Sequence, residues 1–336
     1  MYVTLMGDDK VLTFTIDSKT GALTARGETK VPGGPAPTAI SPSRRNLYIG
    51  RRGSKQISSF NIDQKTGKLT LSGTVELETD PCFISTDRKG LFVLSAYYEG
   101  AGLTIHPISD DGSVEGPPVV RLKTARGAHC FQTDPTNRFA FLPHIAGNGP
   151  NMILQFKFDE ATGRITPNSP DRVEPKEPVG PRHYCFHPRL NVVYFSNEQG
   201  CSVTAYNMDS KSGTLSPFQT VSTLPVDFKG QNTCAQIRMT PNGKFLYAPN
   251  RGHDSIAGFS VDAASGRLTA AGHTAVERVP RAFNIDTEGK FLYSAGLETG
   301  RMGAYRIDQA TGRLDQIGMY EVGQRPMWVL TTRLGS

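Results

Sequence analysis

The sequence predicts an all-β protein with a seven-bladed β-propeller fold, and three observations lead to that prediction. Gly and Pro, with 35 and 23 copies, are spread along all 336 residues, which suits many turns between strands rather than long helices. A short turn phrase returns seven times, at spacings of 45–53 residues. The first and last segments of the chain together complete one of the seven units.

The turn phrase consists of an acidic residue, two or three further residues, Gly, one residue and then Leu, Ile or Val. Asp begins such a turn with a side-chain hydrogen bond to the backbone, and Gly supplies its positive φ angle. Alternating segments such as ISSFNID precede the phrase and a strand-like run follows it, so each copy is predicted to join two strands. The full copies begin at Asp17, Asp63, Asp159, Asp209, Asp262 and Asp308, and a shortened copy spans Asp110–Val114.

A second phrase, such as TPNGKFLYAPN at 240–250, marks another turn between strands in several units. Each unit then holds four strands at a period of about 48 residues, as in a propeller blade. The N-terminal segment supplies only three strands of a unit, and the missing innermost strand is predicted at Arg325–Thr332. We therefore expect one domain, residues 1–336, in which N- and C-terminal strands together close the last blade.

Composition and charge narrow the possible partners. The mean hydropathy is −0.35, and no apolar run approaches the ~18 residues of a membrane helix, so no membrane partner is expected. The net charge of +6 comes without a basic block, so no nucleic-acid partner is expected. The N-terminus lacks a signal-peptide pattern and the five cysteines lack metal-site spacing, which predicts a cytoplasmic protein with reduced thiols and no metal or cofactor. We expect a monomer or weak homo-oligomer.

Aligning the units places residues in columns around the predicted central channel, where we expect a ligand site. The column at the start of the innermost strands contains Ala36, Pro81, His129, Arg182, Ala235, Arg281 and Pro326. The column at the end of the second strands contains Met6, Arg52, Ala96, Ile145, Glu198, Arg251 and Leu297. The residues just before these are Leu5, Arg51, Ser95, His144, Asn197, Asn250 and Gly296.

Consecutive units break the repeat in these columns with charged side chains. Guanidinium groups bind carboxylates and phosphates, while His and Glu move protons near neutral pH, so the pattern predicts an anionic substrate and acid–base chemistry. Arg238, three positions further along its strand, is expected deeper in the channel. A structural reading stays open for each arginine as an inter-blade ion pair and for His183 as a core histidine, and His253 is expected in a turn.

Five motifs carry a resemblance to a known family: GPRHYCFHP, VVYFSNE, FLYAPNRGHDSIAGFSVD, VPRAFNID and VGQRPMWV. Over essentially the full chain the sequence resembles the seven-bladed β-propeller lactonases, in particular bacterial 6-phosphogluconolactonases of the cycloisomerase-2 type. The family includes a fungal carboxy-cis,cis-muconate cyclase whose proposed active site has one His, one Glu and two Arg. Motif by motif, the resemblance implies four catalytic residues: His129 of GAH, Arg182 of PRH, Glu198 of NE and Arg251 of NR. It implies no metal.

The expected function is hydrolysis of a small anionic sugar-acid lactone, 6-phosphogluconolactone or a related aldonolactone, to the open-chain acid. His129 or Glu198 would serve as base or proton shuttle, with Arg182 and Arg251 on the oxyanion or the anionic tail of the substrate. The expected substrate-binding residues are Arg281, Arg238, His183, Asn197 and Arg52. Two alternatives remain: a muconate-type lactonising cycloisomerase, and a non-catalytic ligand-binding or interaction propeller, which would show no polar asymmetry at the channel.

Overall fold

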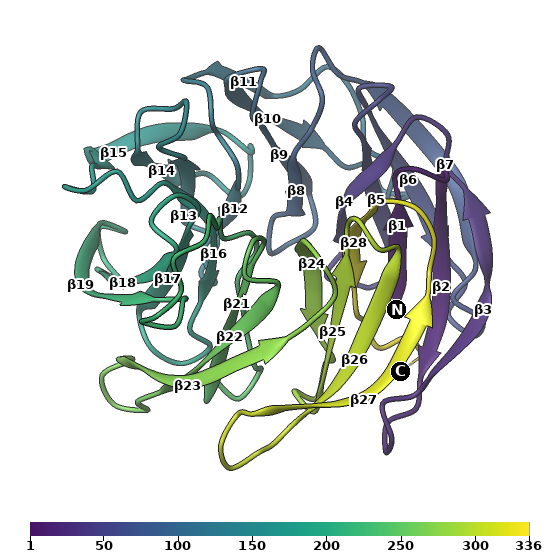
Figure 1. Cartoon of the computed structure of the whole chain (residues 1–336). Helices are drawn as coiled ribbons and strands as arrows, with labels where there is room; N and C mark the ends of the chain where they lie inside the picture. Colours follow the sequence, from purple (N-terminus) through teal and green to yellow (C-terminus); the bar gives the residue numbers. More distant parts are fainter. Residues whose placement is uncertain (336) are drawn as a thin grey trace.

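Seven four-stranded antiparallel sheets follow one another around a ring in the computed structural model, which describes residues 1–335 (Figure 1). The predicted all-β, seven-bladed propeller is confirmed. Within residues 1–335 there is no helix of the length and apolarity needed to cross a membrane.

Each blade is named by its place in the chain, and its strands are given from the innermost to the outermost. Blade one contains β28 (Pro326–Leu330), β1 (Tyr2–Leu5), β2 (Lys10–Ile16) and β3 (Leu23–Lys30). Blade two contains β4 (Pro35–Ile40), β5 (Asn46–Arg51), β6 (Gln56–Ile62) and β7 (Leu69–Glu76). Blade three contains β8 (Phe83–Thr86), β9 (Phe92–Tyr97), β10 (Gly102–Pro107) and β11 (Val120–Lys123).

The remaining four blades follow the same order. Blade four contains β12 (Gln132–Thr133), β13 (Phe139–His144), β14 (Met152–Phe158) and β15 (Ile165–Val173). Blade five contains β16 (Pro181–Phe186), β17 (Val192–Asn197), β18 (Ser202–Met208) and β19 (Leu215–Ser222). Blade six contains β20 (Arg238–Met239), β21 (Phe245–Asn250), β22 (Ser255–Val261) and β23 (Leu268–Ala275). Blade seven contains β24 (Pro280–Ile285), β25 (Phe291–Gly296), β26 (Arg301–Ile307) and β27 (Leu314–Glu321).

The two ends of the chain close blade one. Strand β28 pairs antiparallel with β1, with Val329 opposite Val3 and Trp328 opposite Thr4. The sheet order β28-β1-β2-β3 confirms the predicted closing strand, and the two termini lie on the same side of the ring in Figure 1. Because β28 comes from the C-terminus, the ring closes only when both ends of the chain are in place.

The repeated turn phrase joins the third and fourth strands of the blades. In the first copy, the Asp17 carboxylate accepts hydrogen bonds from the backbone N–H groups of Lys19 (3.0 Å) and Thr20 (2.7 Å). All seven turn glycines have φ between 69° and 86°, a region that favours glycine over residues with a Cβ. The turn chemistry is therefore as predicted. These glycines are Gly21, Gly67, Gly112, Gly163, Gly213, Gly266 and Gly312.

The same turns also join neighbouring blades. In five blades a buried tyrosine of the second strand donates its hydroxyl hydrogen to the turn-glycine carbonyl of the next blade. These bonds are Tyr2–Gly67, Tyr48–Gly112, Tyr194–Gly266, Tyr247–Gly312 and Tyr293–Gly21, at 2.7–3.0 Å. The equivalent positions of blades three and four are Leu94 and Phe141, as the strand registers show. We call these bonds the tyrosine latches.

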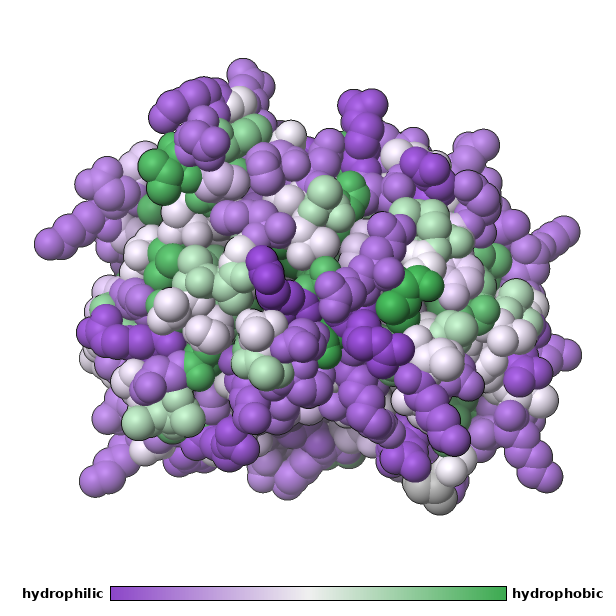
Figure 2. Space-filling model, turned by 60° about the horizontal axis from the view of Figure 1, so that its bottom comes forward, coloured by the Kyte–Doolittle hydropathy of each residue, from purple (hydrophilic) through white to green (hydrophobic). Residues whose placement is uncertain are grey.

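The core lies between blades, because the second strand of each blade is covered on both faces. All six residues of β17 and of β25 are buried, whereas the outer strand β27 is largely exposed. Because the central strands are buried on both faces, their sequences are nearly continuous apolar runs, whereas the outer strands mix polar and apolar residues. On the face shown in Figure 2 the surface is mainly hydrophilic, and apolar residues appear in small separate groups.

A tyrosine latch is expected to contribute measurably to stability. Tyr194→Phe removes the donor and leaves the buried Gly266 carbonyl without it, so the free energy of unfolding should fall by about 1–2 kcal/mol. Chemical denaturation monitored by circular dichroism measures this change. Tyr206→Phe is the matched control, since no hydrogen bond from its hydroxyl is found within residues 1–335. Equal losses for both variants would contradict the latch.

Candidate active site

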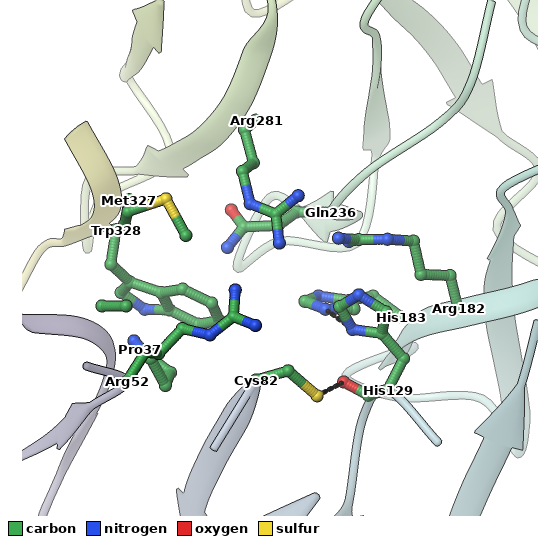
Figure 3. Close-up of a pocket in the computed structure, with 11 residues that line it drawn as sticks. Pro37, Arg52, Cys82, His129, Arg182, His183, Gln236, Arg281, Met327 and Trp328 are labelled. Atoms are coloured by element: carbon green, nitrogen blue, oxygen red, sulfur yellow. Dashed lines mark hydrogen bonds between the residues drawn. The ribbon is translucent and has the colours of Figure 1, made fainter. Parts of the chain in front are cut away.

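A polar cavity opens at the start of the innermost strands, where the predicted columns meet. Residues from all seven blades line it. Figure 3 shows three guanidinium groups, two imidazoles and one indole converging on this space. Its walls are formed by Ala36, Pro37, Arg52, Cys82, His129, Arg182, His183, Gln236, Arg281, Met327 and Trp328.

Arg182 is the most deeply buried of the cavity arginines, with a side chain that is 2% exposed. Its Nε donates to Oε2 of Glu198 at 2.8 Å, and Nη2 of Arg251 donates to Oε1 of the same carboxylate at 2.6 Å. Arg251 Nη2 also donates to the Cys234 carbonyl at 2.9 Å. Nη1 of Arg182 is buried and has no hydrogen-bond partner within residues 1–335. Glu198 thus joins two arginines through both of its oxygens.

The cluster of Arg182, Glu198 and Arg251 contains more positive than negative charge. Burial alone raises the pKa of Glu198, but the charges of Arg182 and Arg251 outweigh it and leave the pKa below its ordinary value. Burial and the neighbouring Arg251 lower the pKa of Arg182 to about 10 despite the Glu198 charge. The carboxylate is therefore ionised at neutral pH, and one negative charge faces several positive ones.

Arg281 and Arg52 complete the cationic wall. Arg52 pairs with Asp80 through Nε at 2.9 Å. Among residues 1–335, Arg281 takes part in no ion pair. Burial, followed by the charges of Arg182 and Arg251, holds the pKa of the Arg281 guanidinium well below its ordinary value. Arg281 is half-buried, and a cation with so little hydration and no carboxylate partner is costly, so this arrangement favours an anionic ligand.

His129 and His183 form a buried pair beside Arg182. His183 Nε2 lies 3.1 Å from His129 Nδ1, and the ring centroids are 4.9 Å apart. Burial, the charge of Arg182 and further nearby charges hold the pKa of both imidazoles well below 6.5. Both rings are therefore neutral at pH 7, and His129 stands where a neutral imidazole can accept a proton from a bound molecule.

The remaining wall is apolar and comes from the closing strand. Trp328 and Met327 of β28 line the cavity, and the Trp328 ring lies 6.1 Å from the His183 ring and 5.7 Å from Phe83. Gln236 faces them, and its Oε1 accepts from the backbone of Phe283, which leaves the amide nitrogen for a ligand. The cavity thus combines three guanidinium groups with an apolar surface from the closing strand.

The structure gathers most of the predicted residues and leaves two aside. His129, Arg182, His183, Arg281 and Arg52 line the cavity, and Glu198 and Arg251 stand directly behind Arg182. Asn197 does not reach it, because the amide is turned within its blade toward Ser202 (2.9 Å) and Thr204 (2.8 Å). Arg238, the first residue of β20, lies outside the cavity lining, two residues after Gln236. His253 bonds Ser255 in a turn, as expected.

The column alignment needs correction in two blades. The innermost-strand column contains Cys82 and Met327 rather than Pro81 and Pro326, because neither unit has a turn proline from which to count. In blade three the second strand ends at Tyr97, so the residue of blade three that is equivalent to Glu198 is Tyr98, not Ala96.

Tyr98 and Trp328 were missed for this reason. The Tyr98 ring lies 5.8 Å from His129, and its hydroxyl donates to Asn148 of the long 145–150 loop at 2.5 Å. The shared hairpin position with positive φ, at Ala101 and Cys201, would have given the correct register.

All five cysteines are free thiols in the structure. Within residues 1–335, no three His, Cys, Asp or Glu side chains come together in a way that would hold a metal ion.

Comparisons with known proteins agree with this architecture. The profile of the family described as "Lactonase, 7-bladed beta-propeller" matches residues 1–331. A 6-phosphogluconolactonase of Pectobacterium carotovorum is 38% identical, and the match covers 92% of this chain and 91% of the relative. A 6-phosphogluconolactonase of Yersinia pestis is 35% identical, and the match covers 98% of this chain and 96% of the relative. The solved structure of a periplasmic gluconolactonase of Pseudomonas aeruginosa covers 97% of this chain and 96% of its own, with a TM-score of 0.88 at 21% identity, which speaks for the fold.

The resemblance found in the sequence motifs is confirmed by these matches, and with it the prediction of a lactonase enzyme. A non-catalytic propeller does not account for them. The chain belongs to the seven-bladed β-propeller lactonase family.

Proposed function

We propose that this protein hydrolyses 6-phosphogluconolactone, or a closely related anionic aldonolactone, to the open-chain acid. The observation that carries the proposal is the convergence of Arg52, Arg182 and Arg281 on a cavity that also presents the neutral imidazole of His129. Guanidinium groups suit both a phosphate and a developing oxyanion. The names of the Pectobacterium and Yersinia relatives support the same substrate.

In this proposal His129 is the general base. When His129 Nδ1–H donates to His183 Nε2, the lone pair of His129 Nε2 faces the cavity and can take a proton from water. The resulting hydroxide attacks the lactone carbonyl carbon, and the proton returns to the ring oxygen as the C–O bond breaks. His183 fixes the tautomer and orientation of His129 and is a positioning residue.

Arg182 is proposed to stabilise the oxyanion of the tetrahedral intermediate. Its Nη1 lacks a partner, whereas its Nε is held by Glu198. A donor fixed in this way needs no reorganisation as charge develops on the carbonyl oxygen. Glu198 is less suited to be the base, because both of its oxygens are bound by arginines that lower its pKa. Its proposed role is to orient Arg182 and Arg251.

The excess positive charge gives a reason for an anionic substrate. The charges of Arg182 and Arg281 add to burial in lowering the pKa of His129. A phosphate on Arg281 and Arg52 would offset these charges and raise the pKa of His129. The base would then strengthen when the correct substrate is bound, while a neutral lactone would leave it weak.

The reduced thiols suit the cytoplasm, which we propose as the location, although the Pseudomonas relative in fold is periplasmic. The hydrophilic face in Figure 2 fits a monomer or weak homo-oligomer.

The first test compares substrates. We expect proton release from 6-phosphogluconolactone with a higher kcat/KM than from unphosphorylated δ-gluconolactone, because only the former fills the cationic wall. A pH-stat or indicator assay corrected for spontaneous hydrolysis measures both rates. Muconolactone serves as the third substrate, and turnover of it alone would favour the cycloisomerase alternative and contradict the proposal.

The pH profile tests the base. Since His129 must be neutral and its pKa lies well below 6.5 in the free enzyme, kcat/KM should stay constant from pH 7 to 6.5 and fall only at lower pH. The acidic limb of kcat reports the enzyme with substrate bound. It should lie at higher pH than the limb of kcat/KM, because the bound anion offsets the arginine charges and raises the pKa of His129. Initial rates from pH 4.5 to 8 measure both limbs.

Two variants serve as controls for this profile. His129→Gln should lower kcat by about 10²-fold or more and remove the acidic limb. Glu198→Gln should keep the acidic limb of the pH profile but raise KM. It should also lower the free energy of unfolding by about 3 kcal/mol, because Arg182 and Arg251 would lose their shared carboxylate. If the acidic limb of the pH profile survived in His129→Gln and disappeared in Glu198→Gln, Glu198 would be the base and the proposal for His129 would be wrong.

Trp328 offers a direct signal of binding. It is the single tryptophan of the chain, so intrinsic tryptophan fluorescence reports on the cavity wall alone. Saturable quenching or enhancement is expected with the product 6-phosphogluconate, and Trp328→Phe should raise KM more than it lowers kcat. An unchanged emission spectrum at product concentrations that inhibit turnover would place the ligand elsewhere.

A further inference from the structure

Two cysteines lie in one polar cluster at the boundary between blades five and six, beside the active site. Cys201 lies in the hairpin between β17 and β18, three residues after Glu198, and is partly exposed. Cys234 lies in the segment before β20 and is fully buried. Asn232 and Asn250 link the two sulfurs: the Asn232 amide donates to Asn250 Oδ1 at 2.9 Å, and Cys234 Sγ lies 3.7 Å from the same oxygen. Asn232 donates to Cys201 Sγ at 3.3 Å, and Thr223 Oγ1 lies 3.1 Å from Cys234 Sγ.

Both cysteines occupy positions that hold other residues in the rest of the ring. The hairpin position of Cys201 has positive φ in every blade, and the other six residues are Asp9, Lys55, Ala101, Asn151, Asp254 and Gly300. Asp9, Asn151 and Asp254 each accept a hydrogen bond from the backbone of the segment that enters the next blade. In blade five a thiol stands in place of that inter-blade acceptor.

The position of Cys234 departs from the repeat in the same way. Strand register places it level with Pro35, Pro181, Pro280 and Pro326. Proline there needs no backbone hydrogen bond, whereas Cys234 N–H donates to the Glu198 carbonyl at 3.1 Å. At one blade boundary the two thiols thus stand where three other blades have a side-chain acceptor and several have a proline, which points to a joint role of the two sulfurs.

The surroundings favour the thiolate of Cys201. The neighbouring Cys234 thiol, the amide of Asn232 and the charge of Arg251 lower the pKa of Cys201 below its ordinary value. Burial raises the pKa values of Cys82, Cys130 and Cys185, which have no such partner. A partly exposed thiolate next to a second thiol is the arrangement found in oxidation-sensitive proteins.

We propose that Cys201 and Cys234 form a reversible disulfide that switches the active site off under oxidising conditions. The Cys201 thiolate attacks one oxygen of hydrogen peroxide, the O–O bond breaks, and a sulfenic acid and hydroxide form. The Cys234 thiol then attacks the sulfenic sulfur, gives up its proton and releases water. In total two thiols and one peroxide yield one disulfide and two waters, and a dithiol reductant reverses the change.

The disulfide would act on Glu198 and Arg251. The backbone of Cys234 binds both of them, through its N–H to the Glu198 carbonyl and its carbonyl to Arg251 Nη2 at 2.9 Å. Drawing the two sulfurs into a covalent bond moves this backbone and the hairpin that carries Glu198. Arg182, held by Glu198, would lose its orientation toward the cavity.

The test uses the full-length reduced protein with hydrogen peroxide as the probe. We expect the intact mass to fall by two hydrogens, a non-reduced digest to link the Cys201 and Cys234 peptides, and lactonase turnover to fall at least about tenfold, since ~1 Å misplacements can cost ~10²-fold. Dithiothreitol should restore all three. The peptide link is measured without any activity, so its failure is distinct from failure of the proposed function.

Two variants make the result specific. Cys201→Asn introduces the residue that blade four has at the equivalent position, so it should fold, keep basal turnover and resist peroxide. Cys185→Ala is the matched control and should remain sensitive. Absence of the linked peptide, a linked protein with unchanged turnover, or peroxide sensitivity retained in Cys201→Asn would each overturn the proposal.

Discussion

The pairing of β28 with β1 is the constraint on which the rest of the molecule depends. A blade buries its central strands only between two neighbours, so an open ring would expose an apolar sheet face and a free edge. The C-terminal strand removes both, and it also brings Trp328 and Met327 into the cavity wall. The same strand thereby completes the fold and the site. We infer that a chain with an unpaired C-terminus would have neither a stable ring nor a complete cavity.

Charge at the centre of the ring follows a second constraint. The blades hold Arg182, Arg251 and Arg281 close together, and within residues 1–335 only the carboxylate of Glu198 bridges two of them. Such an arrangement would be costly if it stayed empty of anions, because burial weakens hydration of each guanidinium. The tyrosine latches and packed central strands hold the arginines together despite this cost. Stability of the ring is thus what allows the site to remain poised for an anion.

Repetition made much of this predictable. The turn phrase fixed the number of blades and the closing strand, because Gly at positive φ is required wherever the hairpin recurs. The columns found His129, Arg182 and Arg281, since equivalent positions face the same channel. Trp328 and Tyr98 escaped because their units lack the prolines that set the count. Asn197 lies outside the cavity lining because its amide nitrogen bonds Ser202 and Thr204 within its own blade, an orientation that sequence spacing alone does not reveal.

The sevenfold repeat also separates what holds the fold from what carries the chemistry. Positions that join blades, such as the tyrosines and turn glycines, recur around most of the ring, because each blade boundary poses the same packing problem. A ring of identical blades would surround its axis with identical side chains, and no lactone has that symmetry. Catalysis therefore requires departures from the repeat at the innermost strands. His129, Arg182 and Glu198 are such departures within blades four and five, and Cys201 with Cys234 follows at the next boundary. Where a repeat protein breaks its own pattern next to a cavity, a function is the physical reason to expect.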